Sequence, residues 1–223
     1  MPQLATSELK KKFSNQGAQS LVLQNISVSF DSDKTYAITG VSGSGKSTFL
    51  HLLAGLDKPT AGSVLFDEHN FADFTKKERE QFLQTQIGMV FQSPYLISEL
   101  SVVQNVMLPA VIAGKKTSEA KHTAQELLKC VGLADRQHAH PSALSGGQQQ
   151  RVAICRAIIN KPVFLLADEP TGNLDVKTGR QIVDLLLLFH KTWGMGLIVA
   201  SHDQYVAHSM QHLLVLKNGT LNR

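Results

Sequence analysis

The segment from 40 to 48 reads GVSGSGKST, and its residue types suit the binding of phosphate groups. The spacing matches the phosphate-loop pattern G-x-x-x-x-G-K-[ST]. Glycines let backbone N–H groups approach phosphate oxygens, and a helix that starts here adds unpaired amides. The lysine neutralises phosphate charge, and the serine hydroxyl can ligate Mg²⁺. The alternative is an ordinary glycine-rich turn. The expected phosphate-binding residues are Gly40, Ser42, Gly43, Ser44, Gly45, Lys46, Ser47 and Thr48.

Two adjacent acids follow a strongly apolar stretch. Residues 162–169 read PVFLLADE, which predicts a strand buried in a sheet and ending at Asp168 and Glu169. In open α/β sheets, ligands bind at the carboxyl ends of the strands. There Asp168 can hold Mg²⁺ through its water shell, and Glu169 can orient and deprotonate a water. The alternative is that both acids only cap the next helix.

A second glycine-rich turn lies within 143–150, which reads ALSGGQQQ. Ser145, Gly146 and Gly147 have the composition of a helix start that binds an anion. The chain already has a complete phosphate loop at 40–48, and one nucleotide does not need two such loops. The residues alone leave a plain helix cap as the alternative.

Strands are indicated by two kinds of pattern. Apolar and polar residues alternate over 21–30, as in a half-buried strand. An Asn218-Gly219 turn within 212–221 predicts a hairpin. Apolar strands that alternate with helices imply a mainly parallel sheet buried on both faces. The other expected strands lie at 34–40, 62–68, 87–92, 162–169 and 195–201.

Helices are expected between these strands. One follows the phosphate loop from about 45 to 54, a capping box opens another at Thr75, and Ser101 with Gln104 is expected to cap a third. Residues from about 95 to 160 are expected to be mainly helical, with a kink or break near Pro109 and a stop at Gly132. A helix of about 15 residues is expected between the last two apolar strands. The patterns together predict an α/β fold with a helical insert.

Composition is that of an ordinary globular protein. Of 223 residues, 43% are hydrophobic and 18% charged, and the excess of Lys plus Arg over Asp plus Glu is 22 − 18 = 4. Basic residues are scattered, which favours a solvated surface over a nucleic-acid patch. Cys130 and Cys155 lack metal-ligand spacing, so we expect both to be buried in a protein of a reducing compartment. No signal peptide and no apolar run near the ~20 residues of a membrane span is evident, so we expect a soluble chain.

In chain order the motifs resemble those of one family. The order GVSGSGKST, Gln92, LSGGQ, LLADEP, NLD at 173–175 and SHD at 201–203 is similar to the nucleotide-binding cassette of ABC ATPases. The resemblance covers essentially the whole chain and implies a single ATP-binding domain over 1–223. It implies a phosphate-loop NTPase fold with a RecA-like, mainly parallel sheet core, an N-terminal antiparallel β region and a helical subdomain at about 95–160. The segments EPTGNLD and AGLDKPTAG resemble the group that serves lipoprotein release, macrolide export, peptide-antibiotic resistance and cell division.

The resemblance assigns further catalytic and metal-binding roles. It implies that Glu169, His202 and Gln92 are catalytic, and that His202 contacts the γ-phosphate of ATP. It also implies that Mg²⁺ is held by Ser47, Asp168 and Gln92. Taken singly, a glutamine is usually a surface residue and a histidine is usually structural.

Two more residues gain roles only through the resemblance. Asp175 would signal across a dimer, although an aspartate that opens a helix is often only an N-cap. Phe13 would stack on adenine, although an N-terminal phenylalanine can equally belong to the core.

The resemblance also gives the second glycine turn a purpose. It implies that the turn caps the γ-phosphate of ATP held by a second subunit, through Leu144, Ser145, Gly146, Gly147 and Gln148. The implied partners are a second, identical or closely related, cassette and an integral membrane permease-type subunit, without nucleic acid. The chain would then be cytoplasmic, on the inner face of the cell membrane. The alternatives are a cassette that transmits a mechanical signal without transport and, more remotely, a nucleic-acid ABC ATPase.

Overall fold

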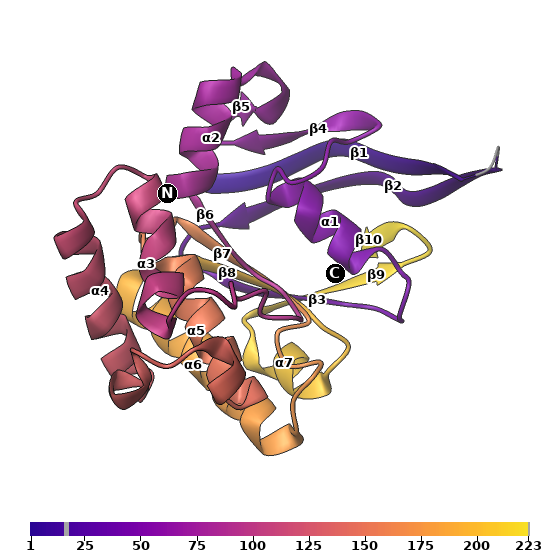
Figure 1. Ribbon diagram of the computed structural model, residues 1–223. Coiled ribbons are helices and arrows are strands. Elements are labelled where there is room, and N and C mark those ends of the chain that lie inside the picture. The colour runs from indigo at the N-terminus through magenta and orange to yellow at the C-terminus, as the bar shows by residue number, and fades with distance from the viewer. Residues whose placement is uncertain (16–17, 223) are drawn as a thin grey trace.

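The computed structural model describes residues 1–15 and 18–222, which form two sheets with helices packed around them (Figure 1). The larger sheet has the strand order β10-β9-β3-β8-β7-β6. Its neighbours pair in parallel from β9 across to β6. Its strands are β3 (Thr35–Thr39), β6 (Ile87–Val90), β7 (Phe164–Asp168), β8 (Gly196–Ala200), β9 (His212–Lys217) and β10 (Thr220–Asn222).

The C-terminal β9 and β10 form the predicted hairpin. They pair antiparallel, and Asn218 and Gly219 between them have positive φ of 51° and 75°. Positive φ at both turn residues matches the twist of the flanking strands, which is why Asn-Gly is favoured there.

The smaller sheet is antiparallel and has the order β2-β1-β4-β5. Its first two strands are long and form a hairpin that extends away from the helices in Figure 1. This sheet is the antiparallel region expected near the N-terminus. Its strands are β1 (Gln3–Asn15), β2 (Ala18–Asp31), β4 (Ala61–Phe66) and β5 (His69–Asn70).

The central strands of the parallel sheet are buried on both faces. Every residue of β7 and of β8 is buried. Successive residues of β7 belong to two different hydrophobic cores, with Leu165 and Ala167 in one and Phe164 and Leu166 in the other. This alternation is the period of two that a strand imposes on its side chains. A strand that is covered on both sides needs apolar residues at every position, which explains the unbroken run in the sequence.

Helices cover both faces of this sheet. Those that follow parallel strands directly are α1 (Lys46–Leu53), α6 (Val176–Trp193) and α7 (Gln204–Ser209). Ahead of β6 lie the short 3₁₀ turn η1 (Phe71–Asp73) and α2 (Lys76–Thr85), which begins with the predicted capping box at Thr75. The elements between β6 and β7 are α3 (Val102–Ile112), α4 (Thr117–Cys130), the 3₁₀ turns η2 (Ala134–Arg136) and η3 (Pro141–Ala143), and α5 (Gly146–Ile158).

Three expectations need correction. Of the kink or break expected near Pro109, the break is absent, because α3 continues to Ile112. Burial of Val106 and Ala110 on either side of the proline explains this, since their packing outweighs one lost backbone hydrogen bond. Cys130 is exposed, because it ends α4 on the outer side, and only Cys155 is buried. The helix between β7 and β8 has 18 residues, longer than expected.

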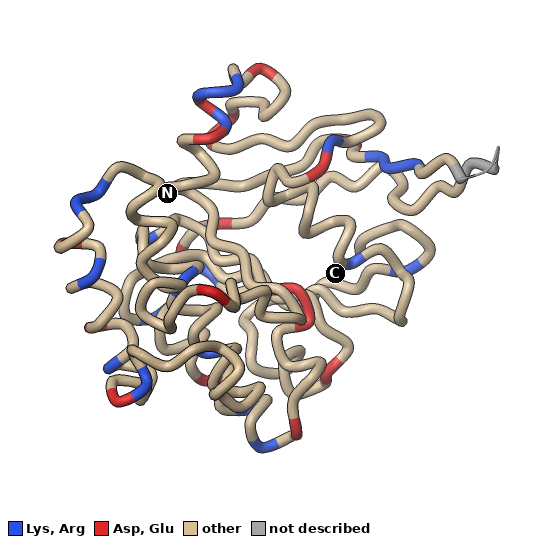
Figure 2. The backbone as a smooth tube through the Cα atoms, in the orientation of Figure 1, with Lys and Arg blue, Asp and Glu red and all other residues tan. Residues whose placement is uncertain are grey.

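The surface and the helices carry two further findings. Acidic and basic residues are interspersed along the tube in the view of Figure 2. Among the helices that the structure describes, none combines the length and the apolar character that crossing a membrane requires.

Candidate functional site

Four loops that carry predicted site residues follow the carboxyl ends of parallel strands. Gly40 follows β3, Gln92 lies two residues after β6, Glu169 follows β7 and His202 lies two residues after β8. Because these strands are parallel neighbours, their carboxyl ends share one edge of the sheet. This is the edge at which α/β folds bind ligands.

The loop at 40–48 needs glycine at two positions for different reasons. A Cβ on Gly40 would lie 2.4 Å from the backbone oxygen of Leu216. Gly45 has φ of 102°, which L side chains rarely adopt, and a Cβ there would lie 2.9 Å from Cγ1 of Val22. The loop therefore packs closely against β9 and β2, and its shape requires residues without a Cβ at these two positions.

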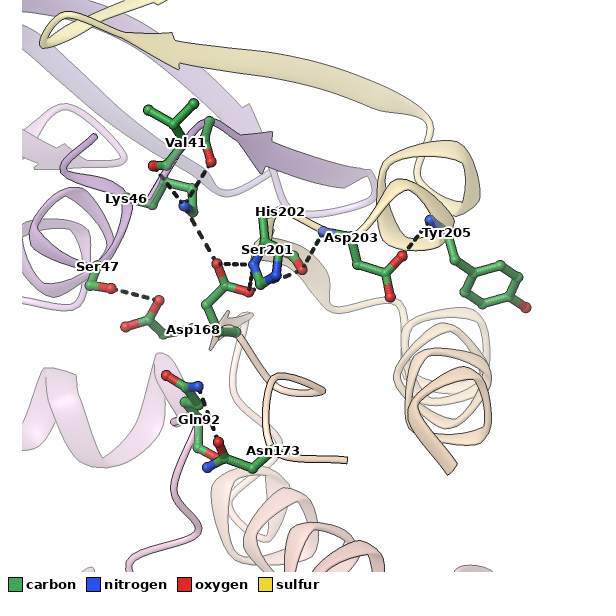
Figure 3. Close-up of polar contacts among 12 residues, drawn as sticks. Val41, Lys46, Ser47, Gln92, Asp168, Asn173, Ser201, His202, Asp203 and Tyr205 are labelled. Atoms are coloured by element: carbon green, nitrogen blue, oxygen red, sulfur yellow. Dashed lines mark hydrogen bonds and ion pairs between the residues drawn. The ribbon is translucent and has the colours of Figure 1, made fainter. Parts of the chain in front are cut away.

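Lys46 and the start of α1 form a positively charged concavity. None of the described side chains caps this helix, whose N-cap is Gly45. Lys46 Nζ donates to the oxygens of Gly40 and Val41 at 2.9 and 3.4 Å and lies 3.4 Å from Glu169 Oε1 (Figure 3). Uncapped helix amides beside a lysine ammonium are the donors that bind phosphate.

Ser47 and Asp168 form an oxygen pair suited to Mg²⁺. The Ser47 hydroxyl donates to Asp168 Oδ1 at 2.9 Å. Burial raises the pKa of Asp168, and the Ser47 hydrogen bond opposes that rise. The described residues include no group of three or more His, Cys, Asp or Glu that could enclose a metal. Such a sparse oxygen set fits Mg²⁺, which keeps several waters and takes further oxygens from substrate phosphates.

Glu169 is surrounded by hydrogen-bonding groups and has positive φ of 44°. The Ser201 hydroxyl donates to Glu169 Oε2 at 3.2 Å, and His202 Nδ1 lies 3.0 Å from the same oxygen (Figure 3). These contacts and Lys46 hold the carboxylate within the shared edge. A carboxylate so placed can accept a proton from a water beside a phosphate.

A cavity of about 690 Å³ joins these groups. It brings the phosphate loop together with Gln92, Glu169 and His202. Gln92 is steadied by Asn173, which accepts from its Nε2 at 3.2 Å. The described residues that line the cavity are Val22, Val41, Ser42, Gly43, Gly45, Lys46, Ser47, Thr48, Gln92, Glu169 and His202.

The segment around Gln92 is bonded to α5, a contact that sequence reasoning missed. The buried Gln150 donates to the oxygen of Phe91 at 3.0 Å. Arg156 donates to the oxygens of Pro94 and Tyr95 at 2.7 and 2.6 Å. No local pattern separates Gln150 from the two glutamines before it, so only the tertiary structure could identify it.

The second glycine turn and Asp175 are helix caps in this chain. Ser145 and Gln148 form a capping box at the start of α5. Asp175 caps α6 by accepting from the backbone N–H of Thr178 at 3.0 Å. A Cβ on Gly147 would lie 2.4 Å from Thr178 Cγ2, so the two helix starts are packed tightly. Neither cap is among the described residues that line the cavity, and their roles across a dimer remain predictions.

Phe13 is exposed, with a relative accessible surface of 43%, so the alternative that it belongs to the core is wrong. Lys11 Nζ lies 4.9 Å from the centre of its ring. Its cross-strand partner Ser20 lines a second cavity, of about 660 Å³, which also includes Gly40 and Gly43. Phe13 itself is not among the described residues that line either cavity, and its stacking on a base remains a prediction.

Comparison with known proteins gives one consistent result. The sequence model of the family described as ABC transporter matches residues 23–172. The lipoprotein-releasing system ATP-binding protein LolD of Idiomarina loihiensis is 42% identical over 220 residues, covering 99% of this chain and 96% of that protein. LolD of Syntrophus aciditrophicus is 44% identical, covering 96% of each chain.

Solved structures agree in fold. The dimeric post-hydrolysis structure of the ATP-binding cassette MJ0796 with ADP and Pi has a TM-score of 0.90 at 36% identity, covering 99% of this chain and 97% of that one. A second dimeric structure of MJ0796 has a TM-score of 0.89. The expected cassette fold is thereby confirmed. The motifs, the shared strand edge and these matches together show that this chain is a member of the ABC transporter family and carries its ATP-binding cassette.

Proposed function

We propose that this ATPase subunit hydrolyses Mg-ATP in the 690 Å³ cavity and works as a dimer to drive lipoprotein release by a membrane partner. One observation carries the catalytic part. The uncapped start of α1, the Ser47–Asp168 pair and the Glu169 carboxylate converge at one edge of the parallel sheet. Phosphate-binding donors, a metal-binding oxygen pair and a proton acceptor are the parts that phosphoryl transfer to water requires.

The cavity residues and the neighbouring Asp168 divide the chemistry among themselves. Lys46 and the loop amides bind the phosphates, and Ser47, Asp168 and Gln92 hold Mg²⁺, which supplies charge neutralisation. Glu169 accepts the proton of the attacking water. His202, hydrogen-bonded to Glu169 at 3.0 Å, contacts the γ-phosphate and orients that carboxylate.

The second half of the site comes from another copy of the chain. The start of α5 lies beside the start of α6, with Ser145 and Gly146 exposed and Gly147 buried. In a head-to-tail pair, the Ser145–Gly147 turn of one chain would face the γ-phosphate held by the other, with Asp175 beside it. The dimeric state of the similar cassette MJ0796 supports this arrangement.

The proposed substrate class rests on the relatives. LolD proteins that match nearly the whole chain are ATP-binding parts of lipoprotein-releasing systems. We infer that this work is done through an integral membrane subunit, the partner that the sequence motifs imply. The chain would then sit on the cytoplasmic face of the membrane through that subunit.

Phosphate release by the purified chain tests the catalytic part. Wild-type protein should release phosphate from ATP only with Mg²⁺, and Lys46→Ala should abolish this by removing the fixed charge. Lys34→Ala is the matched control, since Lys34 pairs with Asp31 and is not among the described cavity residues. Equal rates in wild type and Lys46→Ala would overturn the assignment.

The substrate class is tested in proteoliposomes that hold the chain with its membrane subunit. A triacylated peptide should stimulate ATP turnover, and the same peptide without acyl chains should not. Stimulation by a macrolide and not by the acylated peptide would replace lipoprotein release with drug export.

A further inference from the structure

His51 lies on the same face of α1 as Ser47, one helical turn further along. The two residues are four apart, a spacing that places side chains above one another on a helix. Both face Asp168, at the end of β7. Ser47 Oγ donates to Asp168 Oδ1 at 2.9 Å, and His51 Nε2 lies 3.9 Å from Asp168 Oδ2. The helix thus presents one polar atom to each oxygen of the carboxylate.

Within the part of the chain that the structure describes, Asp168 is the one polar group against which the His51 Nε2 atom lies. This nitrogen is buried from solvent and finds no hydrogen-bond partner there. The centre of the imidazole ring lies 6.0 Å from the centre of the ring of Phe91, the residue before Gln92. A buried ring nitrogen without a partner is costly, so a small movement that brings it to Asp168 is favourable.

The Asp168 carboxylate determines whether His51 Nε2 carries a proton. A lone pair on Nε2 would face the lone pairs of a carboxylate oxygen and be repelled. A proton on Nε2 is attracted instead, whether the ring is neutral or charged. Closing the gap from 3.9 Å to a hydrogen bond requires a shift of about 1 Å.

We propose that His51 is a positioning residue that acts through Asp168, with its Nε2–H holding Oδ2 so that Oδ1 stays with Ser47 and Mg²⁺. This inference rests on the proposed function. A carboxylate held at one oxygen can rotate about its last bond, whereas one held at both cannot. Residues that orient a metal ligand in this way typically change metal affinity by about 10–100-fold when removed.

The test measures Mg²⁺ dependence without turnover. The fluorescent analogue mant-AMPPNP is bound to the full chain while Mg²⁺ is titrated, and its binding is also measured in EDTA. His51→Phe keeps a ring against Phe91 and removes the donor. His51→Gln keeps an N–H at a similar reach. His51→Leu is the second variant without a donor, in case the phenylalanine variant folds poorly.

His51→Phe and His51→Leu should raise the Mg²⁺ concentration for half-maximal binding by about 10-fold, the low end for such residues. His51→Gln should stay near wild type, and binding in EDTA should be equal in all four proteins. A merely structural role would change binding in EDTA as well.

An unchanged Mg²⁺ midpoint in both variants without a donor would overturn the inference, as would a His51→Gln shift as large as theirs. The outcome is separate from that of the proposed function. If Lys46→Ala weakens analogue binding while the His51 variants behave as wild type, only the role of His51 fails. If Lys46→Ala binds as well as wild type, the proposed function fails first.

Discussion

Replacing Glu169 with glutamine should stop hydrolysis while leaving the nucleotide site intact. Glu169 contacts Lys46 Nζ at 3.4 Å, Ser201 Oγ at 3.2 Å and His202 Nδ1 at 3.0 Å. Glutamine has nearly the same shape and can keep hydrogen bonds to the serine and the histidine. It cannot take a proton from water, and loss of a general base lowers the rate by about 10²–10⁴-fold. That factor corresponds to about 3–5 kcal/mol of activation free energy.

The same change should not weaken ATP binding. Lys46 loses a neighbouring negative charge, so its ammonium is freer to bind a phosphate. ATP would then stabilise the head-to-tail pair of chains without being consumed, and the dimer should accumulate by mass action.

The assay combines phosphate release with size-exclusion chromatography, with and without Mg-ATP. Glu126→Gln, on the exposed side of α4, is the matched control and should behave as wild type. Hydrolysis by Glu169→Gln at the wild-type rate would refute the reasoning and remove Glu169 from the catalytic role.

Three other predictions concern residues outside the catalytic carboxylates. Phe13→Ala should weaken ATP binding by roughly 1–3 kcal/mol, the usual loss of one base–aromatic stack, and unchanged affinity in a titration would end that role. Iodoacetamide should label the exposed Cys130 and spare Cys155 in the folded protein, because burial raises the pKa of the Cys155 thiol, and mass spectrometry of peptides would expose the reverse pattern. Gln150→Leu should lower turnover at constant ATP affinity by loosening the backbone before Gln92, and unaltered turnover would show that this bond does not matter.

Motifs with local physical causes were predictable from the sequence. The capping box at Thr75 and the helix cap at Ser101 were predicted and confirmed, because their hydrogen bonds join residues three apart. The Asn218-Gly219 hairpin was predicted for the same reason, since the turn chemistry is local. The parallel strands could be predicted from the sequence because burial on both faces demands uninterrupted apolar residues.

The elements that escaped prediction depend on distant contacts. In β1 the register against β2 shifts between Thr6 and Leu9, between Leu9 and Lys11 and between Lys11 and Lys12, which breaks the alternation that marks a strand. Pro109 reads as a helix breaker until its buried neighbours are known.

In the candidate site too, local motifs could be predicted from the sequence and contacts between distant residues could not. Its phosphate loop and acids form contiguous motifs, so their residues could be named from the sequence. The bond from Gln150 to Phe91 and the approach of His51 to Asp168 join separate elements. A single sequence carries no signal for such pairs.

ATP turnover by a Ser145→Arg variant tests most directly the central claim that each site is shared between two chains. Ser101→Arg is the matched control, because Ser101 forms a capping box of nearly the same geometry at the start of α3, with Ser N to Gln Oε1 distances of 2.9 Å at Ser145 and 2.8 Å at Ser101. At saturating ATP, Ser145→Arg should lose turnover while its monomer binds ATP as wild type does, and Ser101→Arg should keep both. Turnover by Ser145→Arg equal to that of Ser101→Arg, or loss of ATP binding by its isolated monomer, would contradict the shared site.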